Sequence, residues 1–277
     1  FIVDPDRKKM SKSKGNVVTP ADILEAHGTD AVRYWSASSR LGTDAAFDPQ
    51  NPTQVKIGRR LAIKVLNAAK FVLSFPVPEG AEVTHALDAA MLATLDQVVR
   101  DATKAFEAYD HARALEITEA FFWTFCDDYL ELVKERAYNQ TDVGQASAAL
   151  ALRLALSTLL RLLAPVLAFA TEEAWSWFEE GSIHTAAWPT PLEIEGDPTV
   201  LSAASAALIG IRRAKTEAKA SQKTPVARLV LRGDDATIAA LTLAEGDLKA
   251  VGRIAELDLI GGGDTLTVDT VELAPEV

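Results

Sequence analysis

The chain of 277 residues contains a single cysteine, Cys126, which excludes an internal disulfide and is typical of a reducing cytoplasm. Cys126 stands in an apolar helical run, where we expect a buried and unreactive thiol. No uncharged apolar run approaches about eighteen residues, because Arg161 and Pro165 interrupt the closest stretch, 154–170, so no membrane span or membrane partner is expected. The isolated histidines show no metal-ligand spacing with one another or with the cysteine, and no metal site is expected; they are His27, His85, His111 and His184.

The chain also lacks a signal peptide and an initiator methionine, since it begins Phe1-Ile2-Val3 in a strand-like run, and we expect a piece of a longer polypeptide. The net charge of −11 argues against a non-specific nucleic-acid binder. The charge is unevenly spread, however: residues 1–16 carry +3, residues 55–75 carry +5 and residues 211–228 carry +5, which leaves −24 for the rest. Such patches can bind a polyanion at chosen places, although 211–228 is equally compatible with a solvated helix face.

Apolar residues recur at helical spacing over most of the chain, which predicts a mostly α fold. We expect helices at 20–27, 30–38, 54–74, 86–109, 111–138, 143–178 and 199–220. The four long helices between 54 and 178 have short connections, which predicts a helical bundle. Pro165 should kink or split the last of these four.

After about residue 226 the apolar period changes, and we expect a small α+β unit there. Strands are predicted at 228–232, 257–260 and 265–271, with 234–255 mostly helical. The glycine run 261–264 is predicted to form a hairpin turn between the last two strands. The whole chain then divides into three expected regions: 1–50 as the edge of a preceding domain with a loop, 51–195 as the bundle, and 196–277 as a junction helix with the α+β unit.

The densest cationic segment is Lys9-Met10-Ser11-Lys12-Ser13, followed by Lys14-Gly15-Asn16. Lysines supply positive charge, serines supply hydrogen bonds, and Gly15 permits a tight turn, which together suit a polyphosphate. Thr19 and Pro20 then open a helix. Taken alone, such a loop is more often simply solvated.

The string Lys9–Ser13 resembles the signature of class I aminoacyl-tRNA synthetases, and its flanks resemble the valyl-tRNA synthetase family. The segments that carry this resemblance, in order, are 9–20, 28–35, 41–48, 58–62 and 67–71. The resemblance implies the C-terminal part of an ATP-dependent ligase that charges tRNA(Val) with valine, a cytoplasmic monomer that uses ATP with Mg²⁺. The chain has no His-x-Gly-His element, so we expect it to be inactive alone and to hold no cofactor.

In that family the second signature lysine, here Lys12, stabilises the triphosphate as pyrophosphate leaves. The resemblance therefore implies a catalytic and ATP-binding role for Lys12, with Lys9 assisting and Ser11 and Ser13 shaping the loop. Asp44 is by resemblance an anchor for the loop, or else an ordinary turn aspartate. Two alternatives stay open: an isoleucyl- or leucyl-tRNA synthetase, and a free-standing, non-catalytic tRNA-binding module.

The predicted helix 54–74 carries an unusual polar stripe. At 100° per residue, its members fall within about 40° of one line; they are Lys56, Arg60, Lys64, Asn67 and Phe71. Cations hold phosphates, an amide can read a base edge, and bases stack on aromatic rings. Arg59 and Lys70 complete the set of predicted tRNA contacts, in keeping with the family, whose bundle recognises the anticodon side of tRNA. The alternative is that another domain covers Phe71.

Overall fold

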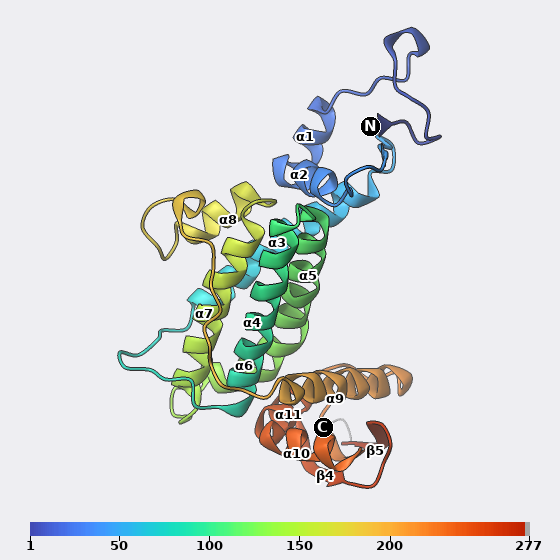
Figure 1. Cartoon of the computed structure of the whole chain (residues 1–277). Helices are drawn as coiled ribbons and strands as arrows, with labels where there is room; N and C mark the ends of the chain where they lie inside the picture. Colours follow the sequence, from blue (N-terminus) through green and yellow to red (C-terminus); the bar gives the residue numbers. More distant parts are fainter. Residues whose placement is uncertain (275–277) are drawn as a thin grey trace. The chain divides into compact units, whose positions relative to one another are not determined.

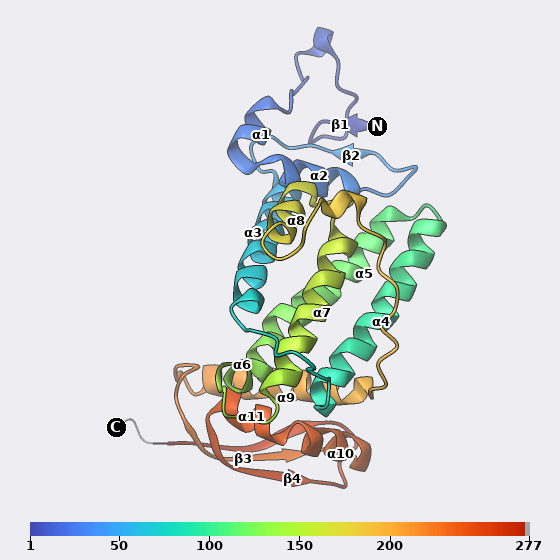
Figure 2. The ribbon, with the colours of Figure 1, turned by 90° about the vertical axis from the view of Figure 1, so that its left-hand side faces the viewer.

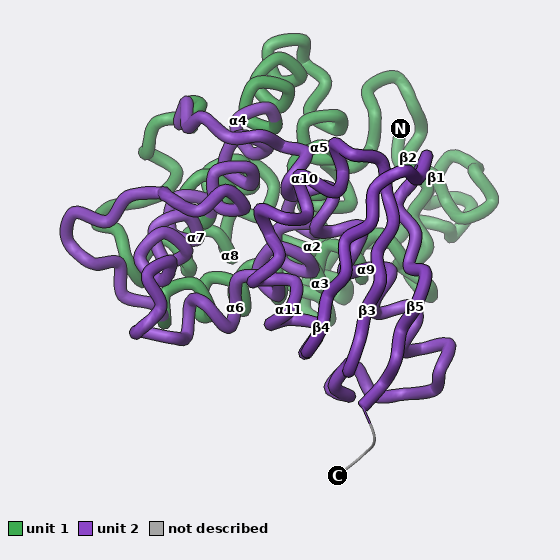
Figure 3. Tube along the Cα trace, turned by 90° about the horizontal axis from the view of Figure 1, so that it is seen from below, with its two compact units in different colours: residues 1–74, 98–120, 156–191 green, residues 75–97, 121–155, 192–277 purple. Residues whose placement is uncertain are grey.

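A computed structural model of the chain describes residues 1–274 (Figure 1). The predicted fold class is confirmed: the chain is mostly helical, and a small sheet follows the long helices. The chain forms two compact units, one from 1–74, 98–120 and 156–191, the other from 75–97, 121–155 and 192 onward (Figure 3). The division falls inside α4 (Ala86–Glu107), α5 (His111–Thr124) and α7 (Gln145–Leu163). The three regions expected from the sequence (1–50, 51–195 and 196–277) are continuous segments, unlike these two units, and that division stays a prediction.

The first unit begins with β1 (Ile2–Val3), which pairs in parallel with β2 (Ala45–Ala46). Between them lie α1 (Ala21–His27) and α2 (Thr29–Ala37), separated by Gly28 at φ +83°, a backbone conformation that favours glycine. The long helix α3 (Thr53–Leu73) follows. One apolar cluster joins α1, α2, the segment after β2 and α3, and its buried members are Ile23, Ala31, Phe47 and Val55.

Helices α2 and α3 pack closely because Gly58 has no side chain. A Cβ atom on Gly58 would lie 2.5 Å from the Cβ of Tyr34, so any larger residue would push α2 away. The Tyr34 hydroxyl donates a hydrogen bond of 2.7 Å to Glu119 on α5. Burial raises the pKa of Tyr34, and the Glu119 carboxylate raises it further, so the hydroxyl stays a donor.

Pro165 splits the last long helix, as the sequence predicts: α7 ends at Leu163 and α8 runs from Ala168 to Trp175. Residues of α2 satisfy the backbone groups that the break leaves open. Arg33 donates to the carbonyls of Pro165 and Val166 at 2.8 and 3.0 Å. The buried Asp30 accepts hydrogen bonds from the backbone N–H groups of residues 169 and 170 at 3.1 and 2.7 Å.

By length and composition α7 is apolar enough to cross a membrane, but 67% of its most apolar stretch is buried inside the protein. A core helix passes the same test, and we assign α7 to the core.

The predicted helix 111–138 is not uniform. After α5, residues Phe125–Tyr129 form a π-helical turn, and α6 (Leu130–Tyr138) continues the chain. Such turns are rare and the sequence carries no signal for one. Cys126 lies in this turn and is buried, as expected.

The α+β unit begins with α9 (Pro198–Glu217), which Asp197 caps by accepting a hydrogen bond from the Thr199 N–H. Strand β3 (Val226–Arg232), helices α10 (Asp235–Leu243) and α11 (Glu245–Gly252), strand β4 (Ile254–Ile260) and strand β5 (Thr267–Leu273) follow. The strand order is β4-β3-β5, with β4 parallel and β5 antiparallel to β3. Helices α9, α10 and α11 pack against this sheet (Figure 2).

The predicted hairpin at 261–264 is therefore wrong, because β3 lies between the two strands that the hairpin was to join. The glycine run instead carries the chain past the end of β3, where the Gly263 N–H donates to the Gly233 carbonyl at 3.0 Å. A Cβ atom on Gly263 would lie 3.3 Å from the Cα of Gly233, so glycine permits this close crossing. The most buried strand, β3, takes the central place.

Candidate nucleic-acid interface and lysine-rich loop

The lysine-rich loop is held closed by one amide and one carboxylate. The Asn16 side chain accepts a hydrogen bond from the Ser11 N–H at 2.9 Å and donates to Asp4 at 2.8 Å. The other Asp4 oxygen accepts from the Lys8 N–H at 2.7 Å. The hydrogen bonds from Asn16 and Lys8 lower the pKa of Asp4, so the clamp keeps its charge.

A short 3-10 turn, Lys12–Lys14, forms the tip of the loop and ends at Gly15 in the left-handed region, φ +66°. The side chains of Lys9, Lys12 and Lys14 are all exposed, and the hydroxyl oxygens of Ser11 and Ser13 lie 3.3 Å apart. The loop thus presents three cations and two hydroxyls to solvent.

The loop is anchored in the core by apolar residues at both of its ends. Met10 and Val18 pack against the cluster that includes Phe47 and Val55. Because Val55 lies in the first turn of α3, the same cluster fixes the base of the loop and the start of that helix.

Asp44, which the resemblance suggests as the anchor, accepts a hydrogen bond of 3.0 Å from the Phe1 amino group, and its anchoring role stays a prediction. Asp4 holds the loop through Asn16 and Lys8, and sequence reasoning missed it. Its only sequence signal is weak: an Asp-Pro pair twelve residues before an asparagine.

The predicted stripe on α3 faces outward. Lys56, Arg60 and Asn67 are exposed, and Lys64 and Phe71 are half-buried. The opposite side is the buried one, as the helical wheel predicts, and it includes Val55, Gly58, Leu61, Val65, Ala68, Ala69 and Val72.

The two flanking cations, Arg59 and Lys70, also make contacts inside the first unit. Arg59 donates to the His27 carbonyl at the end of α1 at 3.0 Å, which satisfies an open helix-end group. The Lys70 ammonium lies 5.6 Å from the centre of the Trp177 ring, within the range of a cation–π contact. Both cations remain exposed, so these contacts orient them without removing them from the surface.

Sequence reasoning missed one apolar member of this surface, Ile63, and one apolar neighbour of Lys70, Trp177. Ile63 is 46% exposed and, at 100° per residue, falls between Lys56 and Lys70 on the wheel. Trp177 is 36% exposed and donates its indole N–H to Glu173 at 3.1 Å. A buried role is the default for such residues in a sequence, which is why the pattern gave no signal. We call the surface formed by Lys56, Arg59, Arg60, Ile63, Lys64, Asn67, Lys70 and Phe71 the α3 face.

The second unit contains a buried charged cluster centred on Arg136. Its guanidinium donates to Asp88 at 2.8 Å through two nitrogens and to Asp247 at 3.0 Å through two, and it also donates to the Gly144 carbonyl. Tyr129 and Ser147 donate to Asp88 at 2.8 and 2.6 Å. The cluster joins α4, α6, α7 and α11 through one side chain.

Burial disfavours the charged forms of Arg136 and Asp247, and their mutual hydrogen bonds favour those charged forms. Burial alone would lower the pKa of Arg136, but its hydrogen bonds to Asp88 and Asp247 raise it, so the guanidinium is fixed as a cation. For Asp247, burial raises the pKa while Arg136 opposes that rise. Among the described residues, no group of three His, Cys, Asp or Glu side chains could hold a metal ion.

Comparison with known families decides the assignment of the bundle. The family described as "Anticodon-binding domain of tRNA ligase" matches residues 88–231, more than half of the chain. The chain belongs to this family of anticodon-binding domains. The family described as "tRNA synthetases class I (I, L, M and V)" matches residues 1–48, which include the lysine-rich loop.

The chain is similar over its whole length to curated valine–tRNA ligases, which confirms the resemblance stated from the motifs. It is 64% identical to that of Leifsonia xyli subsp. xyli (strain CTCB07), covering 100% of this chain and 33% of the relative. It is 55% identical to that of Thermobifida fusca (strain YX), covering 99% of this chain and 32% of the relative. The chain thus spans about a third of the length of these relatives.

Among solved structures, the chain is similar to LeuRS of Agrobacterium radiobacter K84, solved in a ternary complex with tRNA and LeuAMS. The TM-score is 0.54 at 17% identity, covering 98% of this chain and 32% of that chain. At this identity the likeness shows the fold alone, and it agrees with the mostly helical fold described above.

Proposed function

We propose that the chain is the C-terminal part of a valine–tRNA ligase, in which the α3 face binds tRNA(Val) and the lysine-rich loop binds ATP. The observation that carries this proposal is the 64% identity to a valine–tRNA ligase across the whole chain. The match of residues 1–48 to class I synthetases includes the lysine-rich loop and supports ATP binding there, and the match of residues 88–231 to an anticodon-binding domain supports tRNA binding by the chain. Helix α3 lies between the two matched ranges, so its part of the proposal rests on its outward cations and aromatic ring. The ligase that contains the chain is proposed to act as a cytoplasmic monomer, with ATP and Mg²⁺ bound by its catalytic domain.

On the loop, Lys12 and Lys9 neutralise the triphosphate charge that grows as valine attacks ATP and pyrophosphate leaves. Such reactions need little covalent help from the protein, so positioned charge accounts for most of the catalysis. The Asp4–Asn16 clamp and the Met10 anchor support this role, because they restrict where the exposed lysines can lie. Ser11 and Ser13 supply the loop with hydrogen bonds and shape rather than charge.

On the α3 face, we assign the cations to tRNA phosphates, Asn67 to a base edge and Phe71 to a stacked base. Phosphate contacts position a nucleic acid, and base contacts specify its sequence. The exposure of Asn67 and the half-buried state of Phe71 support this division, since both side chains are accessible beside Arg60. Ile63 adds an apolar surface for a ribose or base in the same face.

Isoleucyl or leucyl identity is the alternative within the same class, and a free-standing tRNA-binding module is the alternative outside it. The relatives at 64% and 55% identity favour valine. The likeness to LeuRS, at 17% identity, favours no amino acid.

The base-reading roles of Phe71 and Asn67 predict different responses to substitution. Phe71→Ala should weaken tRNA binding by about 1–3 kcal/mol, largely independent of salt, because one stacked base is lost. Asn67→Ala should leave the affinity for tRNA(Val) less affected and reduce discrimination against tRNAs with altered anticodons. Binding titrations with tRNA(Val) and anticodon variants, at several salt concentrations, measure both effects.

Thermal unfolding is the control for this pair. If Phe71 packs against a neighbouring domain instead, Phe71→Ala should lower the melting temperature of the full-length ligase by several degrees and leave tRNA binding unchanged. That result would remove Phe71 from the proposed interface.

A further inference from the structure

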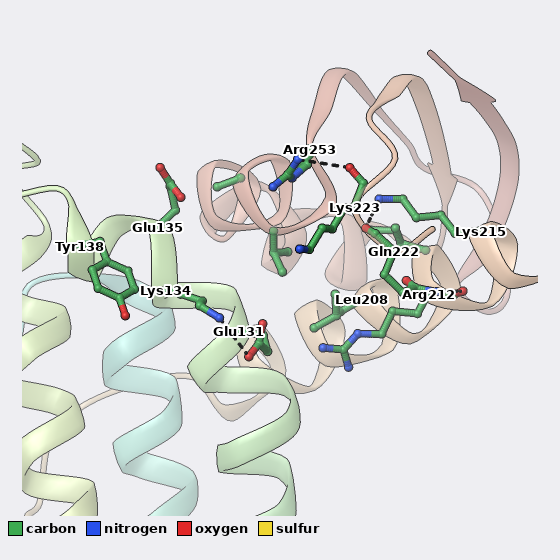
Figure 4. Close-up of a pocket in the computed structure, with 13 residues that line it drawn as sticks. Glu131, Lys134, Glu135, Tyr138, Leu208, Arg212, Lys215, Gln222, Lys223 and Arg253 are labelled. Carbon is green, nitrogen blue, oxygen red and sulfur yellow. Dashed lines mark hydrogen bonds and ion pairs between the residues drawn. The ribbon is translucent and has the colours of Figure 1, made fainter. Parts of the chain in front are cut away.

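A pocket of about 600 Å³ opens in the second unit, where α6, α9, the turn after α9 and the end of α11 meet (Figure 4). Five cationic and two acidic side chains line it: Lys134, Arg212, Lys215, Lys223 and Arg253, with Glu131 and Glu135. The cations outnumber the acidic side chains although the chain as a whole has a net charge of −11. The pocket also contains three cations of the basic segment 211–228, a segment that has no role in the proposed function of the α3 face.

Two of these cations have structural roles. The Lys215 side chain is only 1% exposed, and its ammonium donates to the carbonyls of Gln222 and Gly252 at 3.1 and 2.9 Å. It therefore ties the turn after α9 to the end of α11. Arg212 donates to the Asp127 carbonyl at 2.8 Å and lies 3.5 Å from the Asp128 carboxylate, so its charge is largely compensated.

Lys223 and Arg253 are the cations best placed for a ligand. Both are exposed, and Arg253 donates to the Lys223 carbonyl at 3.3 Å, which holds the two residues together. Arg253 has φ +53° directly after α11, so its position is set by the helix end. Figure 4 shows both side chains on the side of the pocket that faces α6, where Lys134 lies 3.7 Å from Glu131.

An aromatic ring stands at the α6 end of the same pocket. Tyr138 is 57% exposed although it packs edge-on against Phe75, with ring centres 4.9 Å apart. This contact fixes the ring and leaves part of its surface open. The ring and the two exposed cations line opposite ends of one pocket (Figure 4). Single-stranded nucleic acids use both kinds of group, with phosphates on cations and a base on an aromatic ring.

We propose that this pocket is a second RNA contact, in which Lys223 and Arg253 bind backbone phosphates of tRNA and Tyr138 packs against a neighbouring nucleotide. The inference rests on the proposed function and extends it to a surface in the other compact unit. The acidic residues favour an RNA strand over a compact polyphosphate. Glu131 and Glu135 would repel a small, multiply charged anion, whereas a strand places single charges at separated points.

The test is the double variant Lys223→Gln/Arg253→Gln in the chain, titrated with fluorescently labelled tRNA(Val) between about 50 and 200 mM salt. Affinity at the lowest salt should fall about tenfold or more. The slope of log affinity against log salt should fall by about two, one for each lost phosphate contact. The matched control is Lys219→Gln/Lys249→Gln, which removes two cations of the same unit that do not line the pocket. It should change affinity less than threefold, and both variants should keep the wild-type melting temperature.

A parallel titration of Lys56→Ala/Arg60→Ala distinguishes a failure of the pocket proposal from a failure of the proposed tRNA binding by the α3 face. If that variant loses affinity while the pocket variant stays within twofold of wild type, the pocket is not an RNA contact and the proposed function stands. If neither loses affinity, the proposed function fails as well. Calorimetry with inorganic pyrophosphate at matched ionic strength tests the alternative that the pocket binds a small anion. If the wild-type chain binds pyrophosphate, the pocket variant does not, and the tRNA affinity of that variant is unchanged, the RNA assignment is overturned in favour of a small anion.

Discussion

Lys12→Ala in the full-length ligase is expected to slow formation of the aminoacyl-adenylate by about 10²–10³-fold, which corresponds to roughly 3–4 kcal/mol of transition-state stabilisation. The reason is that Lys12 lies exposed at the tip of a clamped loop, where its charge can meet the departing pyrophosphate. Valine binding should hardly change, because the lysine acts on the phosphates. Pre-steady-state measurement of pyrophosphate release tests this.

Lys14→Ala provides the matched control for Lys12. Lys14 is an equally exposed lysine of the same turn, but it stands outside the five-residue string Lys9–Ser13. Its replacement should change the rate by less than about threefold, in line with the small energies of exposed charges. Equal losses for Lys12→Ala and Lys14→Ala would show that the loop contributes general positive charge and would remove the specific role of Lys12.

Arg136→Met should lower the free energy of unfolding by about 3–5 kcal/mol, because it leaves two buried carboxylates facing each other without a counter-charge. Arg136 is 6% exposed and is the only hydrogen-bonding link between Asp88 and Asp247 among the described contacts. Urea unfolding followed by circular dichroism measures the loss. Lys249→Met, a half-exposed change on α11, should cost less than about 0.5 kcal/mol.

A triple variant separates the charge effect from the loss of packing. Asp88→Asn/Arg136→Met/Asp247→Asn removes both carboxylate charges, so it should recover part of the stability that Arg136→Met loses. If Arg136→Met alone costs less than about 1 kcal/mol, the cluster does not hold the second unit together, and its hydrogen bonds contribute little net stability.

The sequence predicted the long helices well because a local signal defines them. Apolar spacing placed α3 and α4 within two residues of their observed ends, and Pro165 marked the break before α8. The same periodicity predicted the outward α3 face, since the buried side of a helix follows from 100° per residue.

The elements that the sequence could not predict depend on contacts between distant residues. A glycine run is equally compatible with a hairpin and with a crossing, so the order β4-β3-β5 needed the structure. Arg136 and Asp247 lie 111 residues apart, and in a sequence each looks like an ordinary surface charge. The Asp4–Asn16 clamp joins residues only twelve apart, but neither carries a distinctive signal in the sequence. The exposure of Ile63 was missed because a buried role is the default for isoleucine.

The central claim, that the α3 face binds tRNA, is tested most directly by two matched double variants of the chain. Lys56→Ala/Arg60→Ala removes two exposed cations one helical turn apart on α3, and Arg100→Ala/Lys104→Ala removes two with the same spacing on α4. We predict that the α3 variant binds tRNA(Val) about tenfold or more weakly, with a salt slope lower by about two, and that the α4 variant binds as wild type does. Equal affinity and slope for the two variants would contradict the account.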